Sequence, residues 1–235
     1  MVHDLQMKLG IMQPYLFPYI GYFQLISAVD KFIIYDDVSY IKQGWINRNR
    51  ILLNGKAFLF TLHLSGASSF KLINEIELAN NRDKLLKTFK QAYVSAPFFN
   101  EIYPIIEKIF TKNDNNLSRF LINSIFEIVK HIKINTQILI SSQVRKNNDL
   151  KGQEKIIDIC RNLGVDHYIN AIGGMELYSR DRFERGGIKL SFIKSKPISY
   201  KQFNNDFVSW LSIIDVMMFS SREQIQEMLN AYELI

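Results

Sequence analysis

The chain has 235 residues, 47% of them hydrophobic, and its 29 lysines and arginines against 23 aspartates and glutamates give a net charge of +6. This size suits one globular domain with a sizeable insertion, and the positive charge favours anionic partners such as nucleotide-sugars, phosphorylated metabolites, nucleic acid or anionic lipid. Cys160 is the only cysteine, which excludes an intrachain disulfide and a cysteine-based zinc cluster.

No hydrophobic run approaches the ~20 residues that are needed to span a bilayer, and Met1 to Met7 lack the apolar region of a signal peptide. We therefore expect no membrane span, a cytoplasmic location, and a short extension before Lys8.

The first predicted unit is a strand, a helix and a second strand. Apolar runs at Lys8–Met12 and Lys31–Tyr35 have the composition of buried strands, and Tyr19–Ala28 can wind into a helix without a breaker. The prolines at 14 and 18 disfavour helix in the residues before them, so the helix is expected to start near Tyr19. The pattern predicts parallel strands and a turn that presents N–H groups and aromatic rings to a ligand.

A polar and aromatic segment at 36–50 follows, and its irregular period is typical of a site loop. Arg50–Leu53 and Lys56–Leu64 flank Asn54-Gly55, a dipeptide that tolerates the left-handed conformation of type I′ turns. We therefore predict a β-hairpin, followed by a short strand at Ile73–Leu78.

From Asn81 to His131 the hydrophobic period becomes helical, and Pro97 and a polar cluster at 112–116 divide this region into three helices. Asn116 or Asp114 is expected to cap the third. Strands then alternate with helices, with strands predicted at Gln137–Ser141, Asp166–Asn170 and Ile188–Ile193 and helices at Gly152–Asn162, Met175–Glu184, Phe207–Phe219 and Arg222–Tyr232. The order predicts an α/β fold with a mostly parallel sheet, for which a HUP or nucleotidylyltransferase-like arrangement is one form, with a β-hairpin and a helical insertion at about 81–131.

Two unusual blocks carry a family resemblance. The first is Met12-Gln13-Pro14-Tyr15-Leu16-Phe17-Pro18-Tyr19-Ile20-Gly21-Tyr22-Phe23, and the second joins Tyr35-Asp36-Asp37-Val38 to Lys42-Gln43-Gly44-Trp45-Ile46-Asn47-Arg48-Asn49. Together with Tyr168, Gly173-Gly174 and the late block Leu211-Ser212-Ile213-Ile214-Asp215, they resemble the WbqC-like family from Lys8 to about Ser220. The resemblance implies a single α/β domain over residues 1–235.

Members of that family are similar to proteins encoded among bacterial surface-polysaccharide and O-antigen genes. The resemblance implies a transferase of lipopolysaccharide O-antigen biosynthesis that forms an amide between an acyl or aminoacyl donor and the amino group of a nucleotide-linked amino sugar. The donor could be a thioester, an aminoacyl-tRNA or an adenylate. The residues expected to bind substrate are Gln13, Pro14, Tyr15, Tyr19, Gly21, Tyr22, Lys42, Trp45, Asn47, Arg48, Asn49, Gly173 and Gly174.

Amide formation needs a base that removes a proton from the attacking amine, and the candidates are Asp36, Asp37 and His167. The aspartates follow a predicted strand, where open α/β sheets place ligand groups, although a turn or cap would also explain the pair. His167 precedes Tyr168 and Gly173-Gly174, which makes it the best placed of the histidines.

Cations suited to an anionic ligand gather in the site loop. Arg48 and Arg50, preceded by Trp45, can form a guanidinium fork for a phosphate or carboxylate, and Lys42 adds a further positive charge. Asp215 lies on a predicted helix, and a buried carboxylate there would need a partner, for which Arg48 is a candidate.

A second similarity concerns Pro18-Tyr19-Ile20-Gly21-Tyr22, which occupies the junction at which nucleotidylyltransferases and adenylating ligases carry a His-Ile-Gly-His signature. Tyr19 and Tyr22 stand where the histidines would be, and because tyrosine is neutral at pH 7, the charge that stabilises an ATP-derived phosphate would be missing. Ser141-Ser142 with Arg145 is a counterpart of the second phosphate-contacting motif in this interpretation.

Two alternatives to the transferase therefore stay open, a non-catalytic nucleotide-sugar-binding or scaffold protein of the same pathway and an ATP-dependent adenylating ligase. The histidines and acids show no pairing at metal-ligand spacing, so we predict no metal site. The sequence leaves the cofactor and the oligomeric state open. Cys160 shares the apolar face of its helix with Ile156, Ile157 and Leu163, which predicts a core residue rather than a nucleophile.

Overall fold

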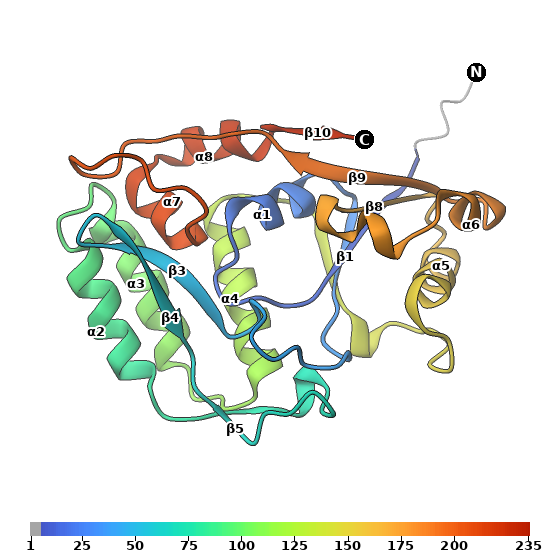
Figure 1. Ribbon diagram of the computed structural model, residues 1–235, viewed down its shortest axis with the longest axis horizontal. Coiled ribbons are helices and arrows are strands. Elements are labelled where there is room, and N and C mark those ends of the chain that lie inside the picture. The colour runs from blue at the N-terminus through green and yellow to red at the C-terminus, as the bar shows by residue number, and fades with distance from the viewer. Residues whose placement is uncertain (1–5) are drawn as a thin grey trace.

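A six-stranded mixed sheet forms the centre of the computed structural model, which describes residues 6–235 (Figure 1). Most of the extension expected before Lys8 therefore lies outside the described residues. The parallel strands are β1 (Lys8–Met12), β2 (Lys31–Ile34), β7 (Gln137–Ile140), β8 (His167–Ala171) and β9 (Lys189–Ser195), and β10 (Tyr232–Leu234) pairs antiparallel with β9. The predicted α/β class and mostly parallel sheet are confirmed.

The strand order is β7-β2-β1-β8-β9-β10. Numbered along the chain, the parallel strands therefore follow the order 3-2-1-4-5 that doubly wound sheets use. The chain winds outward from β1 in one direction and, from β8 onward, in the other. In such a sheet the crevice beyond the carboxyl ends of the two central strands is where ligands bind.

Helices cover both faces of the sheet. On one face α1 (Ile20–Ser27) and α8 (Arg222–Leu229) pack in a hydrophobic cluster that includes Phe32 and Ile34 of β2. The intervening Ile33 points to the other face, where the second cluster contains α5 (Gly152–Asn162) and α6 (Arg180–Arg185). This alternation follows from the two-residue period of a strand.

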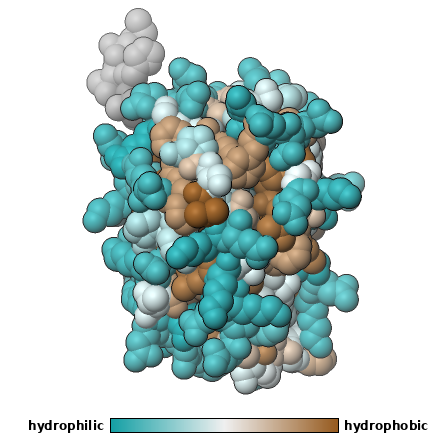
Figure 2. All heavy atoms as spheres, turned by 90° about the vertical axis from the view of Figure 1, so that its left-hand side faces the viewer, coloured by the Kyte–Doolittle hydropathy of each residue, from teal (hydrophilic) through white to brown (hydrophobic). Residues whose placement is uncertain are grey.

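The predicted hairpin and three helices are confirmed and lie together at one end of the molecule (Figure 1). The hairpin strands are β3 (Arg48–Leu53) and β4 (Lys56–Thr61), and the helices are α2 (Arg82–Tyr93), α3 (Phe99–Thr111) and α4 (Leu117–His131). Asn54 and Gly55 have φ angles of 52° and 73°, as a type I′ turn requires, and the Asn116 side chain caps α4. Figure 2, which views this end, shows apolar areas divided by polar side chains.

Five predicted elements differ from the structure, two of them only in length: the strand predicted at Lys56–Leu64 ends at Thr61, and the helix predicted at Arg222–Tyr232 ends at Leu229, before β10. Ile73–Leu78 forms a 3₁₀ turn followed by β6 (Glu77–Leu78), which pairs with β5 (Leu64–Ser65), rather than one strand. The helix predicted at Met175–Glu184 is divided into a 3₁₀ segment at Ile172–Leu177 and the short α6. The helix predicted from Phe207 begins only at Ile213, as α7 (Ile213–Phe219), because the N–H groups of Ser212 and Ile213 donate to the carbonyls of Arg50 and Pro18.

Phe17 anchors the turn between β1 and α1. Its side chain is fully buried, stacks on Phe110 at 5.9 Å between ring centroids, and meets the edge of Phe89 at 6.2 Å. Its φ angle is 45°, in the left-handed region that non-glycine residues rarely adopt. Aromatic packing therefore fixes the turn in one conformation.

Cys160 is completely buried in the cluster under α5, and burial raises the pKa of its thiol to about 12. Because only the thiolate is nucleophilic, we expect no reaction with the thiol reagent DTNB at pH 8 while the protein is folded. Absorbance during a guanidinium titration should show labelling that follows unfolding. Rapid labelling of the native protein would contradict this prediction.

Among residues 6–235, no helix is both long and apolar enough to cross a membrane.

Candidate functional site

A cavity of about 760 Å³ lies at the carboxyl ends of the parallel strands. Its lining reaches from Tyr35, directly after β2, across Gln13 and Ala171 to Ser195 at the end of β9. With strands about 4.8 Å apart, the cavity spans roughly 14 Å across the sheet edge. It therefore includes the point between β1 and β8 where the winding reverses, which is the position that ligands occupy in open α/β sheets.

The lining comes from two stretches of chain, before 51 and after 169. The first contributes Ile11, Met12, Gln13, Tyr15, Pro18, Tyr19, Gly21, Tyr22, Tyr35, Ile41, Trp45, Asn49 and Arg50. The second contributes Asn170, Ala171, Ile172, Gly173, Gly174, Leu177, Tyr178, Ile193, Ser195 and Trp210. Nine of the residues expected to bind substrate are brought together here, namely Gln13, Tyr15, Tyr19, Gly21, Tyr22, Trp45, Asn49, Gly173 and Gly174.

Tyrosine hydroxyls supply much of the polarity of the lining. Burial raises the pKa of Tyr15 and of Tyr178, and raises that of Tyr22 well above its ordinary value. Burial and the nearby negative charge of Asp37 raise the pKa of Tyr35 to about 12. These hydroxyls remain protonated at neutral pH; Tyr22 and Tyr15 donate to Gln13, and the hydroxyls of Tyr35 and Tyr178 are the ones that can donate to a ligand.

Tyr19 is held against the first turn of α1. Ser195 Oγ donates its one proton to Gln24 Oε1 at 2.6 Å, so Tyr19 Oη must donate to Ser195 Oγ at 3.3 Å. The Tyr19 ring crosses Gly21 so closely that an added Cβ there would lie 2.0 Å from the Tyr19 hydroxyl oxygen. Gly21 is therefore required for this position of the ring.

We expect a Gly21→Ala substitution to displace the Tyr19 ring and to lower ligand affinity about fivefold, through loss of an interaction of about 1 kcal/mol. Thermal stability should change little. The higher helix propensity of alanine stabilises α1 by about 1 kcal/mol, which offsets the loss of the hydrogen bond between Tyr19 and Ser195. Calorimetric titration and melting curves measure both effects. Gly44→Ala is the control, because Gly44 does not line the cavity and its Cβ would come no closer than 3.3 Å to the Ile41 carbonyl; equal affinities for the two variants would contradict the prediction.

Asn49 connects the hairpin to the turn between β1 and α1. Its side-chain amide donates to the carbonyls of Leu16 and Phe17 at 3.1 and 2.8 Å, and its Oδ1 accepts from the N–H of Arg50 at 2.8 Å. Across the turn, the Tyr22 hydroxyl donates to the carbonyl of Gln13 at 3.1 Å. These bonds keep the turn and the hairpin in register around the cavity.

Arg50 is the only charged side chain that lines the cavity within the described part of the chain. Its guanidinium lies 5.4 Å from the centre of the Trp45 ring, and that of Arg48 lies 5.8 Å from the same ring. Arg48 donates to the carbonyls of Gly44, at 2.9 Å, and of Gln43, so it braces the loop. Of the two arginines that the sequence predicted as a fork for an anion, only Arg50 therefore lines the cavity, and its binding of an anion stays a prediction.

The amino end of α1 adds a second feature suited to an anion. Tyr19 is the N-cap residue and makes no side-chain cap hydrogen bond, and Gly21 in the first turn lines the cavity. The first N–H groups of a helix have no partner within the helix, and the helix dipole makes this end attractive to negative charge. Arg50 and the start of α1 therefore present positive potential to one cavity.

The three residues expected to act as a base lie outside the lining. Both carboxylate oxygens of Asp36 accept from Ser142, from its N–H at 2.9 Å and its hydroxyl at 2.8 Å. His167 Nε2 lies 3.0 Å from Ser191 Oγ at the start of β8, whereas the cavity lies beyond the other end of that strand.

Asp37 has a different environment. Its Oδ2 lies 2.7 Å from the ammonium of Lys146, whose side chain is only 3% exposed. Its Oδ1 is buried and has no hydrogen-bond partner among residues 6–235. The Asp37 carboxylate is thus paired with Lys146 and lies near the Tyr35 side chain, which lines the cavity.

Four of the expected binding residues also lie outside the lining, and one of them is Arg48, which binds the loop carbonyls of Gly44 and Gln43. Lys42 is exposed, Pro14 is buried, and Asn47 accepts from the Tyr40 hydroxyl and donates to the carbonyl of Leu62, both at 2.8 Å. Asn47 therefore fixes the loop rather than facing the cavity.

The sequence had suggested Arg48 as the partner of Asp215, but other residues bind this carboxylate. The Asp215 carboxylate is fully buried and accepts from the Tyr93 hydroxyl at 2.7 Å, the Tyr200 hydroxyl at 2.8 Å and Gln202 Nε2 at 2.6 Å. Burial raises the pKa of Asp215, and the three hydrogen bonds oppose this shift. Neutral donors thus take the place of a counter-charge.

The sequence did not assign Asn170, Ser195, Tyr178 and Trp210 to the site. Asn170 and Ser195 end predicted or observed strands, so the rule that ligand groups follow parallel strands could have found them. Asn170 also explains Gly174, where a Cβ would lie 2.3 Å from the Asn170 amide nitrogen. No sequence signal marks Trp210. In the described part of the chain, no three His, Cys, Asp or Glu side chains gather as a metal ion would require.

Comparison with known proteins gives the following relationships. No solved structure matches this chain. It is similar to the uncharacterized protein Rv1507c of Mycobacterium tuberculosis, with 27% identity over 218 residues that cover 89% of this chain and 92% of that protein. The model of the WbqC-like protein family matches residues 13–227, and the chain therefore belongs to the WbqC-like protein family.

Proposed function

We propose that this protein binds a nucleotide-linked amino sugar in the tyrosine-lined cavity and joins the sugar's amino group to an acyl or aminoacyl donor during surface-polysaccharide biosynthesis. The observation that carries the binding step is Arg50, which forms no salt bridge with residues 6–235 and lies beside Trp45 in a cavity at the winding reversal of a parallel sheet. The assignment of this amino sugar to surface-polysaccharide biosynthesis rests on the family resemblance.

The size and chemistry of the cavity support a nucleotide-linked sugar. Its volume falls within the range of roughly 300–1,000 Å³ that small-molecule sites occupy, and its length of roughly 14 Å suits an elongated ligand. Arg50 and the amino end of α1 suit the diphosphate, since a guanidinium can bind phosphate oxygens through two hydrogen bonds. Aromatic rings such as Trp45 and Trp210 suit a base or a sugar ring.

Asp37 is the favoured base for the transfer. Asp36 is held by Ser142 and His167 lies at the opposite end of β8 from the cavity, whereas Asp37 Oδ1 has no hydrogen-bond partner among residues 6–235 and Asp37 lies near Tyr35, which lines the cavity. As the amine nitrogen bonds to the acyl carbon, the Tyr35 hydroxyl takes the amine proton and gives its own proton to Asp37, and the same relay runs back to protonate the leaving group as its bond to that carbon breaks. We assign the stabilisation of the oxyanion to Asn170, which lines the cavity and whose amide nitrogen has no acceptor among the described residues.

A non-catalytic nucleotide-sugar-binding protein of the same pathway is the second candidate. The observation that favours it is that no Asp, Glu or His lines the cavity within residues 6–235. An adenylating ligase has less support, because Ser141 and Ser142 lie outside the lining and Tyr19 and Tyr22 carry no charge.

The test combines binding with product analysis. Melting temperatures are measured against increasing UDP- and dTDP-linked amino sugars, ATP, and acyl-coenzyme A, since a ligand of the folded state raises stability with its concentration. Mass spectrometry then looks for the amide product with each donor. A shift and an amide support the transferase, and a shift without any amide supports the binding protein. A shift with ATP alone would overturn both in favour of a ligase.

A further inference from the structure

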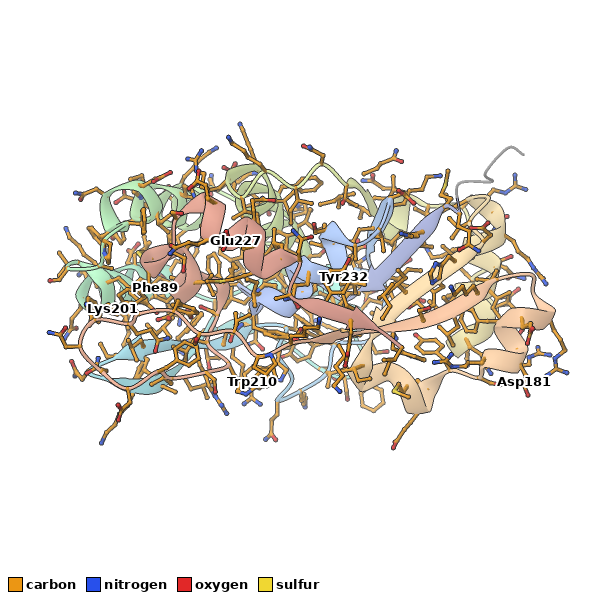
Figure 3. The ribbon with its side chains drawn as sticks, turned by 90° about the horizontal axis from the view of Figure 1, so that it is seen from above. Phe89, Asp181, Lys201, Trp210, Glu227 and Tyr232 are labelled. Atoms are coloured by element: carbon orange, nitrogen blue, oxygen red, sulfur yellow. The ribbon has the colours of Figure 1, made fainter. Side chains whose placement is uncertain are left out.

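The segment from Lys196 to Ser212 forms no helix or strand, although it is well ordered by contacts with its surroundings. Structureless connections of this length inside a compact fold are uncommon and are often functional. Figure 3 shows Lys201 near one bend of the segment and Trp210 near its other end. We call residues 196–212 the strap.

Trp210 is the unusual residue of the strap. Its side chain is 69% exposed, yet it lines the cavity and its ring centroid lies 5.5 Å from that of Tyr19. Its φ angle is 60°, and a bulky residue is held in this left-handed conformation only where the surrounding structure enforces it. Such enforcement at the edge of a cavity indicates a functional position for the ring.

The side-chain hydrogen bonds that hold the strap lead to Asp215. The Gln202 side chain holds Val208 at both ends, donating to its carbonyl at 3.0 Å and accepting from its N–H at 2.7 Å. The same Gln202 amide and the Tyr200 hydroxyl both donate to Asp215 Oδ1. The other oxygen of Asp215 is bound by Tyr93 of α2, so the carboxylate joins the strap to the helical end of the molecule.

We propose that Trp210 is a ligand-binding residue that stacks on the nucleoside base, and that Asp215 is the positioning residue that holds the strap and its tryptophan at the cavity. The assignment of a base rests on the proposed function, whereas the role of Asp215 does not. A nucleoside base is the flat partner that an exposed tryptophan beside a tyrosine accommodates, and stacking of this kind tolerates different bases.

Trypsin tests the positioning role without any ligand. Within the strap only Lys201 is cleavable, because Lys196 precedes Pro197. We expect Asp215→Asn to speed cleavage after Lys201 at least tenfold, with cleavage in α2 and α3 unchanged. An unchanged rate at Lys201 would overturn the role of Asp215. If that variant does not fold, Gln202→Met, which removes the link to Val208 from the strap side alone, is expected to give the same acceleration.

Binding of nucleoside diphosphates tests the ligand role. Trp210→Ala is expected to weaken the tightest binder among UDP, dTDP, ADP and GDP about tenfold, and to leave the affinity for inorganic pyrophosphate, which has no base, unchanged. Equal losses for both probes, or none for the nucleotide, would overturn the stacking. Failure of every probe to bind wild-type protein would overturn the proposed function and the stacking together, while the trypsin result still decides the role of Asp215.

A double-mutant cycle connects the two residues. If Asp215 acts through Trp210, Asp215→Asn should cost about the same affinity as Trp210→Ala, and the double variant should lose no more than either single one. Trp45→Ala is the matched control, because its ring lines the cavity from another segment and its loss should add to that of Asp215→Asn. Additivity with Trp210→Ala would overturn the connection.

Discussion

An Asp37→Asn substitution is expected to lower the free energy of unfolding by about 3 kcal/mol, measured by urea denaturation. The reason is that it leaves the ammonium of Lys146, which is 3% exposed and 2.7 Å from Asp37, without a counter-charge. Removal of one member of a buried pair costs far more than replacement of both members. A loss below 1 kcal/mol would show that water or another group already compensates Lys146.

The double variant Asp37→Asn with Lys146→Met separates structure from chemistry. It removes the stranded charge and is expected to recover most of the lost stability. Amide formation should remain absent in this stable variant if Asp37 is the base. Recovered turnover would instead identify Asp37 as a structural residue. The base would then have to be a group of the substrate or of the donor. Asp36→Asn serves as the neighbouring control, since its carboxylate binds only Ser142 through its side chain.

An Arg50→Ala substitution is expected to weaken binding of a nucleoside diphosphate by about 2 kcal/mol, or roughly 30-fold, in a calorimetric titration. Arg50 supplies the only positive charge on the lining described, and its side chain is exposed, so stability should stay within about 0.5 kcal/mol. Arg48→Ala is the matched control, because that guanidinium is occupied by loop carbonyls. A larger loss for Arg48→Ala than for Arg50→Ala would reverse the assignment.

The sequence predicted those parts of the fold that local patterns determine. The strand at Lys8–Met12, the helix at Gly152–Asn162 and the turn at Asn54-Gly55 have the expected bounds, because periodicity and turn chemistry act within a few residues. The order of the strands in the sheet could not be predicted, since β1 and β8 pair although more than 150 residues of chain separate them. The late start of α7 was missed for the same reason, because distant carbonyls bind the N–H groups before it.

The candidate site was foreseeable to the extent that it follows the first strand. The block from Gln13 to Tyr22 is rich in rings and prolines where a strand meets a helix, and four of its tyrosines and glycines do line the cavity. Trp210 was not foreseeable, because it packs beside Tyr19 and its segment is bound to the carbonyl of Arg50, both far away along the chain. Neither Trp210 nor Gln202 lies in a local sequence pattern that distinguishes it from an ordinary core or loop residue.

The distribution of the lining along the chain has an evolutionary consequence. Every lining residue falls at or before Arg50 or at or after Asn170, so the long middle of the chain builds none of the binding surface described. Mutations that lengthen or shorten the loop at 66–70, where Phe70 is almost fully exposed, can therefore accumulate without changing which molecule is recognised. Relatives could differ in the size and surface charge of this middle part of the chain and still bind the same ligand. A further domain could be inserted at this loop with little effect on ligand binding.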